Sequence, residues 1–232
     1  MESGDEIRHL SDRVEGFLGR REGPYLFRPA KRGARLGVIV EIGSWKGKST
    51  IWLAKGSEAV AGQPVYAVDP HTGGADFETL GYTKINTEKE FRDNITRAGV
   101  EDRVIPLVMP SPRASEGWQW PIGFLWIDGD HRYEGVSMDF HSWAPHVVAG
   151  GIVAFHDTYS WEGVRRVVDE EILRAPGYKV LGQMDGILAI EKRASLSLID
   201  QANIFVTRSL RGVYNRARIG KKHWRALPTP KI

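Results

Sequence analysis

Short apolar runs alternate with amphipathic segments along most of this chain. Five runs are rich in β-branched and aromatic residues and end at a glycine, a proline or a polar side chain, which is typical of buried strands. They cover residues 35–43, 63–70, 102–109, 121–128 and 150–157. The segments that follow them place apolar residues at helical spacing, which predicts helices over 48–57, 86–99, 133–148 and 161–173.

The order of these elements predicts the fold class. Strand and helix alternate through most of the chain, and residues 178–192 contain two further strands that meet at Asp185-Gly186, a hairpin signal. Alternation of this kind is typical of an α/β protein with a doubly wound, mostly parallel sheet and helices on both faces. We therefore expect seven strands, of which the last two form a C-terminal antiparallel hairpin.

The two ends of the chain differ from this middle part. Residues 5–19 carry apolar side chains at helical spacing, so we expect residues 1–34 to form an N-terminal helical cap. Residues 35–193 hold the predicted sheet, and residues 194–232 form a basic C-terminal extension. Within the sheet domain, residues 71–84 lack periodicity and are rich in turn-forming residues, which predicts a long loop that closes over a site.

Composition narrows the possible classes of protein. Hydrophobic residues make up 41% and charged residues 26% of the 232 residues, which is ordinary for a globular protein. The absence of cysteine excludes disulfides, cysteine nucleophiles and thiolate zinc sites. The chain shows neither a run of about 18 apolar residues nor a basic start followed by an apolar stretch, so we expect no transmembrane segment, no secretion signal and a cytoplasmic location.

Polar residues stand at the end of every predicted parallel strand. They are Glu41 with Gly43, then Asp69, then Ser111, then Asp128 with Asp130 and His131, and finally His156 with Asp157. Ligands of a doubly wound sheet bind outside the carboxyl ends of its strands, so we expect these residues to form one site. For any single residue a structural role stays open, because aspartates cap helices and glycines ease turns.

The stretch EIGSWKGKST, residues 41–50, holds the first of these positions. It contains Gly-Lys-Ser, but only three residues separate Gly43 from Gly47, whereas a P-loop needs four. Asp69 follows at the second strand end, near the spacing at which an acidic side chain accepts hydrogen bonds from a ribose diol. A ligand with a ribose and no diphosphate suits both features, and S-adenosylmethionine is the common cofactor of that description.

Three stretches resemble a known family. VEIGSWKGKSTIWLA, VYAVDPH and FLWIDGDHRYEGVSMDFHSWAPHVVAGGIVAFHD are similar to motifs of class I S-adenosylmethionine-dependent methyltransferases. Within that class they resemble the bacterial branch of small-molecule and sugar O-methyltransferases, which is related to catechol and macrocin-type enzymes. The resemblance covers about residues 36–192 and implies a Rossmann-like fold and methyl transfer to a hydroxyl.

The resemblance also implies roles for individual residues. Binding of S-adenosylmethionine would fall to Glu41, Gly43, Ser44, Trp45, Ser49, Asp69, Ser111 and Asp128, with Ser111 near the adenine. Metal-dependent relatives hold a divalent cation at the ends of the fourth and fifth strands. Asp128 and Asp157 match those positions, His156 or Thr158 would supply the third ligand, and we favour Mg²⁺.

His131 is the expected general base, acting together with Asp128. It lies where catechol-type relatives carry a lysine, and the ordinary pKa of histidine, about 6.5, suits proton removal at neutral pH. The structural alternative is a histidine that caps the following helix or hydrogen-bonds Asp130.

The acceptor is expected to be a small molecule, because the chain carries no added docking domain. Trp118, Trp120 and Trp161 are expected near the active edge, where aromatic faces suit a sugar or a phenol. We favour a sugar or a short saccharide, and by analogy a mycobacterial-type methyltransferase of methylated mannosides is one candidate. A homodimer is the expected assembly.

The C-terminal extension keeps other hypotheses open. Eight of the 32 basic residues follow Asp200 and no acidic residue does. An RNA methyltransferase that uses this tail is the main alternative, although nucleic acid is disfavoured because the N/D-P-P-Y signature of amino methyltransferases is absent. Residues 196–219 are expected to dock on the core or on a second subunit, with a membrane-surface role as a further alternative. A nucleotide hydrolase is the least favoured reading, since it leaves Asp69 without a role.

Overall fold

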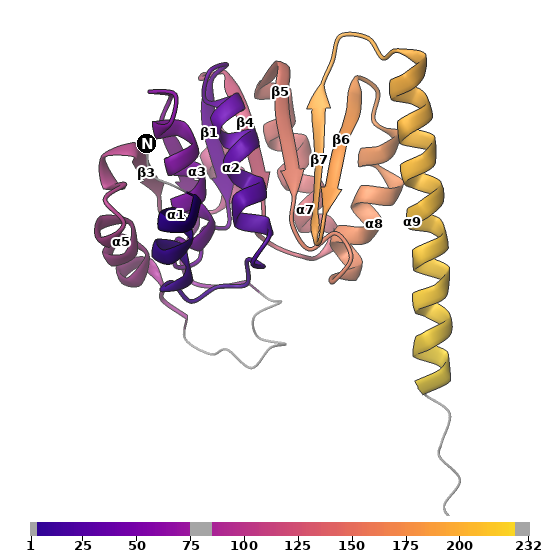
Figure 1. Ribbon diagram of the computed structural model, residues 1–232, viewed down its shortest axis with the longest axis horizontal. Coiled ribbons are helices and arrows are strands. Elements are labelled where there is room, and N and C mark those ends of the chain that lie inside the picture. Colours follow the sequence, from indigo (N-terminus) through magenta and orange to yellow (C-terminus); the bar gives the residue numbers. More distant parts are fainter. Residues whose placement is uncertain (1–3, 75–84, 226–232) are drawn as a thin grey trace, which may run out of the picture.

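A seven-stranded sheet forms the centre of the computed structural model, which describes residues 4–74 and 85–225, with side chains up to residue 217. The strands are β1 (Val38–Ile42), β2 (Val65–Val68), β3 (Val104–Leu107), β4 (Ile122–Ile127), β5 (Val147–Phe155), β6 (Tyr178–Met184) and β7 (Ile187–Lys192). They lie in the order β3-β2-β1-β4-β5-β7-β6. β1 to β5 are parallel, and β7 runs antiparallel to both β5 and β6 (Figure 1). The predicted fold class is confirmed.

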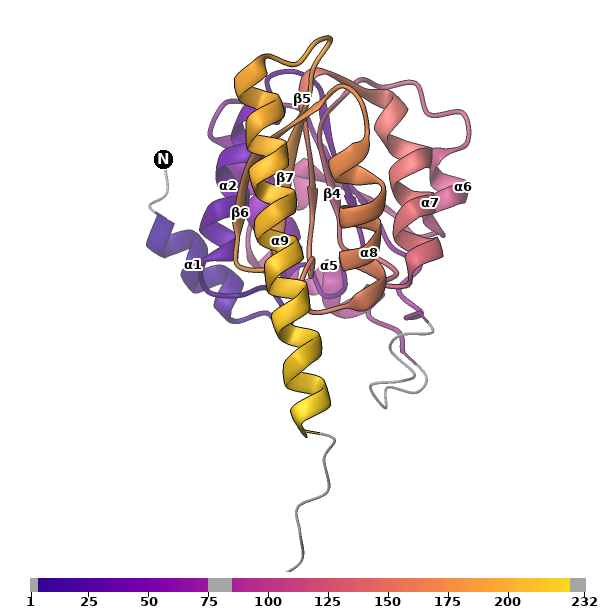
Figure 2. The ribbon, with the colours of Figure 1, turned by 90° about the vertical axis from the view of Figure 1, so that its right-hand side faces the viewer.

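Helices cover both faces of this sheet (Figures 1 and 2). Side chains of α1 (Gly4–Asp12), α2 (Glu22–Gly33), α3 (Lys48–Glu58) and α5 (Glu88–Arg97) share one apolar core with the sheet. Side chains of α7 (Tyr133–Trp143) and α8 (Glu162–Glu170) form the core of the other face, together with Ala114 of the short α6 (Ser111–Ser115). Short 3₁₀ turns occupy Glu101–Arg103, Ala144–His146 and Ile172–Arg174, and α9 (Leu198–Arg225) ends the described chain.

The central strands explain why the sheet needs cover on both sides. Every residue of β4 is buried. Phe124 and Trp126 enter the first core, whereas Leu125 and Ile127 enter the second. Continuous apolar strands of this kind are typical of parallel sheets that are covered on both faces.

The N-terminal segment differs from the prediction. The helix expected over residues 5–19 ends at Asp12, in keeping with the weak helix propensity of Gly16 and Gly19 beyond it. A second helix, α2, was not predicted, because Pro24 and Pro29 argue against a helix there and Pro29 lies inside it. Leu26 of α2 is fully buried in the first core. The segment that was predicted to be an N-terminal cap therefore contributes to the core of the sheet domain.

The basic C-terminal extension forms one long helix. α9 lies beside β6 at the edge of the sheet, and its last turns extend beyond the body of the protein (Figures 1 and 2). Within the described residues, no helix combines the length and the apolar character that crossing a membrane requires. Most of the loop predicted over residues 71–84 lies outside the described residues.

Candidate active site

A cavity of about 620 Å³ opens at the carboxyl ends of the parallel strands. The loop after β1 forms one end of it, the loops after β4 and β5 form the other, and residues 16–18 between α1 and α2 close a side. The predicted site residues that line it are Gly43, Ser44, Trp45, Ser49, Asp69, Ser111, Asp128, His131 and Asp157. The structure therefore brings most of the predicted residues together, while Glu41 and His156 lie outside the cavity lining.

Two glycines shape the loop after β1. Gly43 has a φ of 83°, and a Cβ atom on it would lie 2.2 Å from the backbone carbonyl oxygen of Asp128. Only glycine therefore lets this loop lie against the end of β4. Gly47, with a φ of 92°, precedes the first residue of α3, and its N–H donates to the carbonyl of Ser44 at 2.8 Å.

Asp69 holds this loop from the end of β2. Its Oδ2 accepts hydrogen bonds from the backbone N–H groups of Ser44 at 2.9 Å and Trp45 at 2.8 Å. Its Oδ1 accepts one from the N–H of His71 at 2.7 Å. These three backbone N–H groups are therefore hydrogen-bonded to Asp69 and not directed at a ligand. Asp69 also lines the cavity, so its predicted contact with a ribose stays a prediction.

Ser44 offers a free polar group at the same end of the cavity. Its side chain is buried, and its Oγ has no hydrogen-bond partner among the described residues. A buried hydroxyl without a partner is costly, and a bound polar ligand would remove that cost. The loop therefore suits a ligand with a polar group at this end.

Glu41 supports the loop from beneath instead of lining the cavity. Its carboxyl group is fully buried and accepts hydrogen bonds from Ser49 Oγ at 2.6 Å and Thr50 Oγ1 at 2.5 Å, both on α3. Burial raises the pKa of Glu41 to about 8, and the two hydroxyl hydrogen bonds only partly oppose this rise. Glu41 thus ties the end of β1 to the first turn of α3.

Ser111 belongs to a second cluster of buried polar residues. The sequence predicts Ser111 as a site residue but not its partner Asp139. Its Oγ donates to Oδ1 of Asp139 at 2.5 Å and accepts a hydrogen bond from Trp143 Nε1 at 2.9 Å. Burial raises the pKa of Asp139 to about 7. Asp139 lines the cavity although it lies on the buried face of α7. An acidic residue among the apolar positions of a helix was the signal that could have found it.

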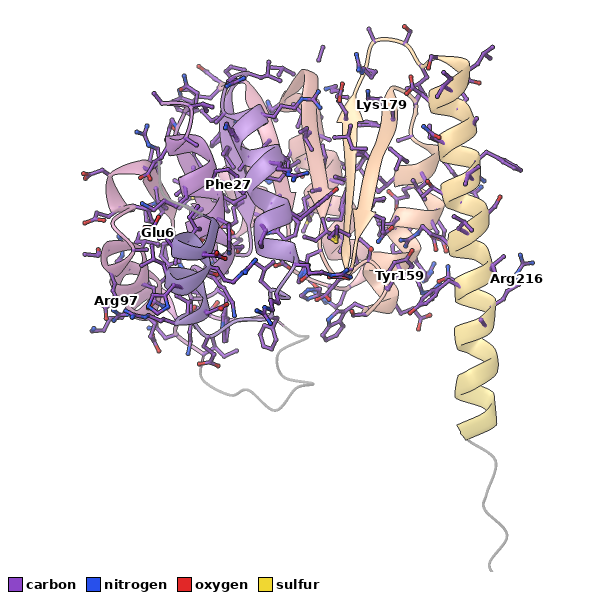
Figure 3. All side chains as sticks on the ribbon, viewed as in Figure 1. Glu6, Phe27, Arg97, Tyr159, Lys179 and Arg216 are labelled. Atoms are coloured by element: carbon purple, nitrogen blue, oxygen red, sulfur yellow. The ribbon has the colours of Figure 1, made fainter. Side chains whose placement is uncertain are left out.

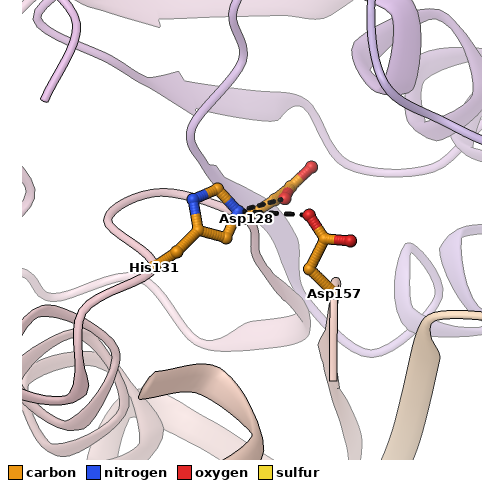
Figure 4. A group of neighbouring side chains, drawn as sticks. All are labelled: Asp128, His131 and Asp157. Atoms are coloured by element: carbon orange, nitrogen blue, oxygen red, sulfur yellow. Dashed lines mark ion pairs between the residues drawn. The ribbon is translucent and has the colours of Figure 1, made fainter. Parts of the chain in front are cut away.

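His131 meets two carboxylates at the opposite end of the cavity. Its Nε2 lies 3.6 Å from Oδ1 of Asp128 and 3.4 Å from Oδ2 of Asp157 (Figure 4). Burial alone would raise the pKa of Asp128, but the charge of His156 and hydrogen bonds from both histidines outweigh it and lower that pKa. The ring of Trp161 stacks on His131 with centroids 4.8 Å apart.

These three side chains are also a group that could hold a cation. One ligand atom from each of Asp128, His131 and Asp157 lies within 4.8 Å of the others. Two carboxylates and one imidazole suit a divalent metal ion. The group contains His131 in the place where His156 was predicted.

His156 instead lies behind the site. Its Nδ1 is 3.0 Å from Oδ1 of Asp128 and its Nε2 is 3.1 Å from Oε2 of Glu22. Burial would lower the pKa of His156, but the charge of Asp128 and the hydrogen bonds to Asp128 and Glu22 raise it well above the ordinary value. A protonated imidazole has no free lone pair, so this environment disfavours His156 as a metal ligand.

Glu22 also belongs to this region, and no pattern in the sequence predicts it. It comes from α2, is buried, and also accepts hydrogen bonds from the N–H groups of Gly186 at 2.9 Å and Gly19 at 2.6 Å. Because α2 itself was not predicted, nothing placed its first residue near the strand ends.

Of the three tryptophans expected near the active edge, one lines the cavity and two do not. Trp161 lines the cavity, and so does Phe17, which contacts Trp45 at a centroid distance of 6.3 Å. Trp118 and Trp120 precede β4 and pack together with Tyr66, away from the cavity. Their expected place at the active edge is wrong, because the loop before a parallel strand lies at the opposite edge from the loop after it.

Fold and site together define a class of protein. A parallel sheet that ends in an antiparallel hairpin, a glycine loop after β1 and an acidic residue after β2 are the features of class I S-adenosylmethionine-dependent methyltransferases, and the predicted resemblance is confirmed. A family model described as a methyltransferase domain matches residues 40–158, just over half of the chain. The chain therefore belongs to this methyltransferase family.

Solved structures share the fold at low sequence identity. Cofactor-bound Rv0187 from MTB has a TM-score of 0.60 and 21% identity, covering 82% of this chain and 88% of that one. The O-methyltransferase from Bacillus cereus in complex with SAH has a TM-score of 0.57 and 21% identity, covering 83% and 93%. TomG from Streptomyces achromogenes, an O-methyltransferase involved in tomaymycin synthesis and bound to SAM, has a TM-score of 0.55 and 14% identity, covering 83% and 92%.

A curated protein matches over a shorter stretch. The uncharacterized protein R132 of Acanthamoeba polyphaga mimivirus is 27% identical over 128 residues. The match covers 53% of this chain and 53% of that protein, so the chain spans about half the length of this relative.

Proposed function

We propose that this protein transfers the methyl group of S-adenosylmethionine to a hydroxyl of a small molecule, with His131 as the general base. The observation that carries the proposal is a single cavity lined both by the glycine loop and by the group of His131, Asp128 and Asp157. The glycine loop and the free Ser44 Oγ suit the amino-acid part of the cofactor, and Asp69 suits its ribose. When bound, S-adenosylmethionine supplies an electrophilic methyl group on its sulfonium.

His131 supplies what a neutral hydroxyl lacks. The Nε2 atom takes the hydroxyl proton as the acceptor oxygen forms its bond to the methyl carbon and the carbon–sulfur bond breaks. The imidazolium that results lies beside Asp128 and Asp157, whose negative charges stabilise it. Trp161, stacked on the ring, holds its orientation.

A divalent cation is a second part of the proposal. Asp128 and Asp157 would hold it, with Mg²⁺ as the expected ion, and it would lower the pKa of the acceptor hydroxyl. His131 can serve either as the third ligand or as the base, because Nε2 has one lone pair. The charge of His156 already compensates one carboxylate charge in the group of Asp128, His131 and Asp157. This weakens the attraction of that group for a cation.

The proposed acceptor is a sugar or a short saccharide. Phe17 and Trp161 both line the cavity, and 59% of Phe17 is exposed. Aromatic faces beside an acidic cluster suit a ring that carries hydroxyl groups. We keep the homodimer as a prediction, which light scattering on the purified full chain would check.

A methyl-transfer screen tests these assignments. Glycosides and phenols would be incubated with labelled S-adenosylmethionine, with and without EDTA, and with Mg²⁺ added back. Transfer to glycosides is expected. Activity that survives chelation would remove the metal from the proposal and leave His131 as the base. A crystal soaked with S-adenosylhomocysteine that shows no ligand in the cavity would contradict the proposed function itself.

A further inference from the structure

The helix α9 has one face that is firmly attached to the body of the protein. The side chain of Arg211 is almost completely buried and donates to Oδ1 of Asp169 at 2.6 Å and to the carbonyl oxygen of Thr158 at 2.9 Å. Asn215, one turn further on, donates to Oδ2 of Asp169 at 2.7 Å. These contacts fix which side of the helix faces solvent.

The other side of α9 exposes large apolar side chains. They are Leu198, Ile199, Phe205, Val206, Leu210, Val213 and Tyr214, with exposed fractions from 47% to 83%. Tyr214 lies at the border with the attached face, because its ring also packs on Tyr159 with centroids 4.6 Å apart. At 100° per residue, Ile199, Val206, Leu210 and Val213 fall within one narrow stripe, and Leu198, Phe205 and Tyr214 widen it to about half of the circumference. This apolar arc is broader than the seam that two paired helices share.

A cleft lies along one flank of this apolar arc. It has a volume of about 430 Å³ and is lined by Asp169, Arg174, Phe205, Arg208, Ser209, Gly212 and Asn215. Neither Arg174 nor Arg208 pairs with a carboxylate within residues 4–74 and 85–217. Both oxygens of Asp169 are already occupied by Arg211 and Asn215. Nε of Arg174 donates to the backbone carbonyl oxygen of Asp169 at 3.3 Å. The cleft therefore presents two guanidinium groups that form no ion pair among the described residues, with the ring of Phe205 beside them.

The charge of the rest of α9 has the same sign. Asp200 is the last acidic residue of the sequence, and Arg216 and Arg218 follow Val213 along the helix, which continues to Arg225. Figure 3 shows Arg216 pointing outward from the side of α9 that faces away from the sheet. Two copies that paired side by side in parallel would bring these like charges together. An anionic lipid surface would instead complement them.

We propose that α9 is a membrane-surface helix that binds anionic phospholipids. The lipid phosphate occupies the cleft between Arg174 and Arg208, and the apolar arc from Leu198 to Tyr214 enters the headgroup and acyl boundary with the helix axis parallel to the bilayer. The attached face, with Arg211, keeps the enzyme on the water side. This interaction surface does not depend on the acceptor or on the chemistry at His131.

Vesicle co-sedimentation of the full chain tests the proposal. Mixed vesicles of phosphatidylcholine and phosphatidylglycerol are expected to bind the protein at least about tenfold more strongly than phosphatidylcholine alone, because each basic side chain near an anionic surface contributes about 1 kcal/mol. High salt should weaken the binding. Equal binding to both kinds of vesicle, or to neither, would overturn the proposal.

Two pairs of variants separate the apolar arc from the cleft. Phe205→Asp should abolish vesicle binding, whereas Leu36→Asp, at an exposed apolar position away from α9, should leave it unchanged. The double variant Arg174→Ala and Arg208→Ala should bind about 30-fold more weakly, since two basic contributions are lost. Arg97→Ala on the distant α5 is its control (Figure 3). All of these side chains are exposed, so each variant should fold like the parent chain. Thermal unfolding would check this.

Other binding partners of α9, a second copy of the chain or a nucleic acid, would give different results with the same variants. A concentration-dependent dimer in sedimentation velocity that Phe205→Asp dissociates, without vesicle binding by the parent chain, would assign the arc to a second copy. Salt-sensitive retention on RNA that the double arginine variant loses, again without vesicle binding, would assign the cleft to nucleic acid. Either result would overturn the membrane proposal.

Discussion

The two ends of the cavity are built in different ways. At the glycine-loop end, backbone geometry decides the shape: Gly43 has a left-handed conformation and Asp69 accepts backbone N–H groups. At the other end, side chains from distant parts of the chain converge, among them His131, Asp157 and, behind them, Glu22. The first end is a rigid frame, whereas the second depends on a balance of charges. Substitutions should therefore act mainly on folding and cofactor binding at the first end and mainly on turnover at the second.

The sharpest test of the charged end is His131→Ala. Turnover should fall by about 10² to 10⁴-fold, the range that a positioned general base supplies, while affinity for S-adenosylmethionine changes little. Steady-state kinetics and calorimetric titration of the cofactor would measure both. Unchanged turnover would remove His131 from the mechanism.

At the rigid end, Gly43→Ala should cost about 3 kcal/mol or more in the free energy of unfolding. The new Cβ would lie 2.2 Å from the carbonyl oxygen of Asp128, and the φ of 83° disfavours any side chain. Gly47→Ala is the matched control, since its φ is 92° but its Cβ would approach only side chains, those of Phe91 at 3.3 Å and Ile95 at 3.4 Å. Urea unfolding should show the smaller loss for Gly47, about 1 to 2 kcal/mol. Equal losses would contradict the close approach as the cause.

Glu22→Gln tests the balance of charges around His156, behind the site. The quantity to follow is the pH dependence of the free energy of unfolding. The pKa of His156 is raised in the folded state, so its stabilising contribution is complete below the unfolded pKa of 6.5 and is lost as the pH rises through the folded value. Removing the charge of Glu22 should lower that folded pKa and reduce the free energy of unfolding by about 2 kcal/mol near neutral pH. The difference between variant and parent should shrink at alkaline pH, as urea titrations would show. A constant difference would mean that Glu22 acts through packing alone.

Glu41→Gln should give the smallest change. Burial raises the pKa of Glu41 from 4.5 to about 8, so its folded state binds the extra proton and stability falls as the pH rises between these two values. The neutral amide does not titrate, so the variant should lack this loss of stability between about pH 5 and pH 8. Thermal unfolding across this range would measure it, and a parallel pH dependence of both proteins would contradict a raised pKa.

The same contrast explains what the sequence could predict. The strands, the glycine loop and the polar strand ends follow local rules of periodicity and turn chemistry, and these placed Asp69, Asp128, His131 and Asp157 around one cavity. Glu22 and Asp139 were missed because their roles depend on tertiary packing: one lies at the start of a helix with two prolines, the other on the buried face of α7. His156 was predicted as a ligand from its position next to Asp157. Adjacent residues leave the end of a strand in different directions, and local rules do not assign those directions.

The buried guanidinium of Arg211 sets a limit on where this chain can be shortened. A protein cut after Lys192 would lose the cation beside Asp169 and the donor to the carbonyl oxygen of Thr158, which directly follows Asp157 in the chain. A cut beyond Asn215 would spare both of these contacts. Removing the whole tail would therefore disturb the end of β5, and with it Asp157, which lines the cavity.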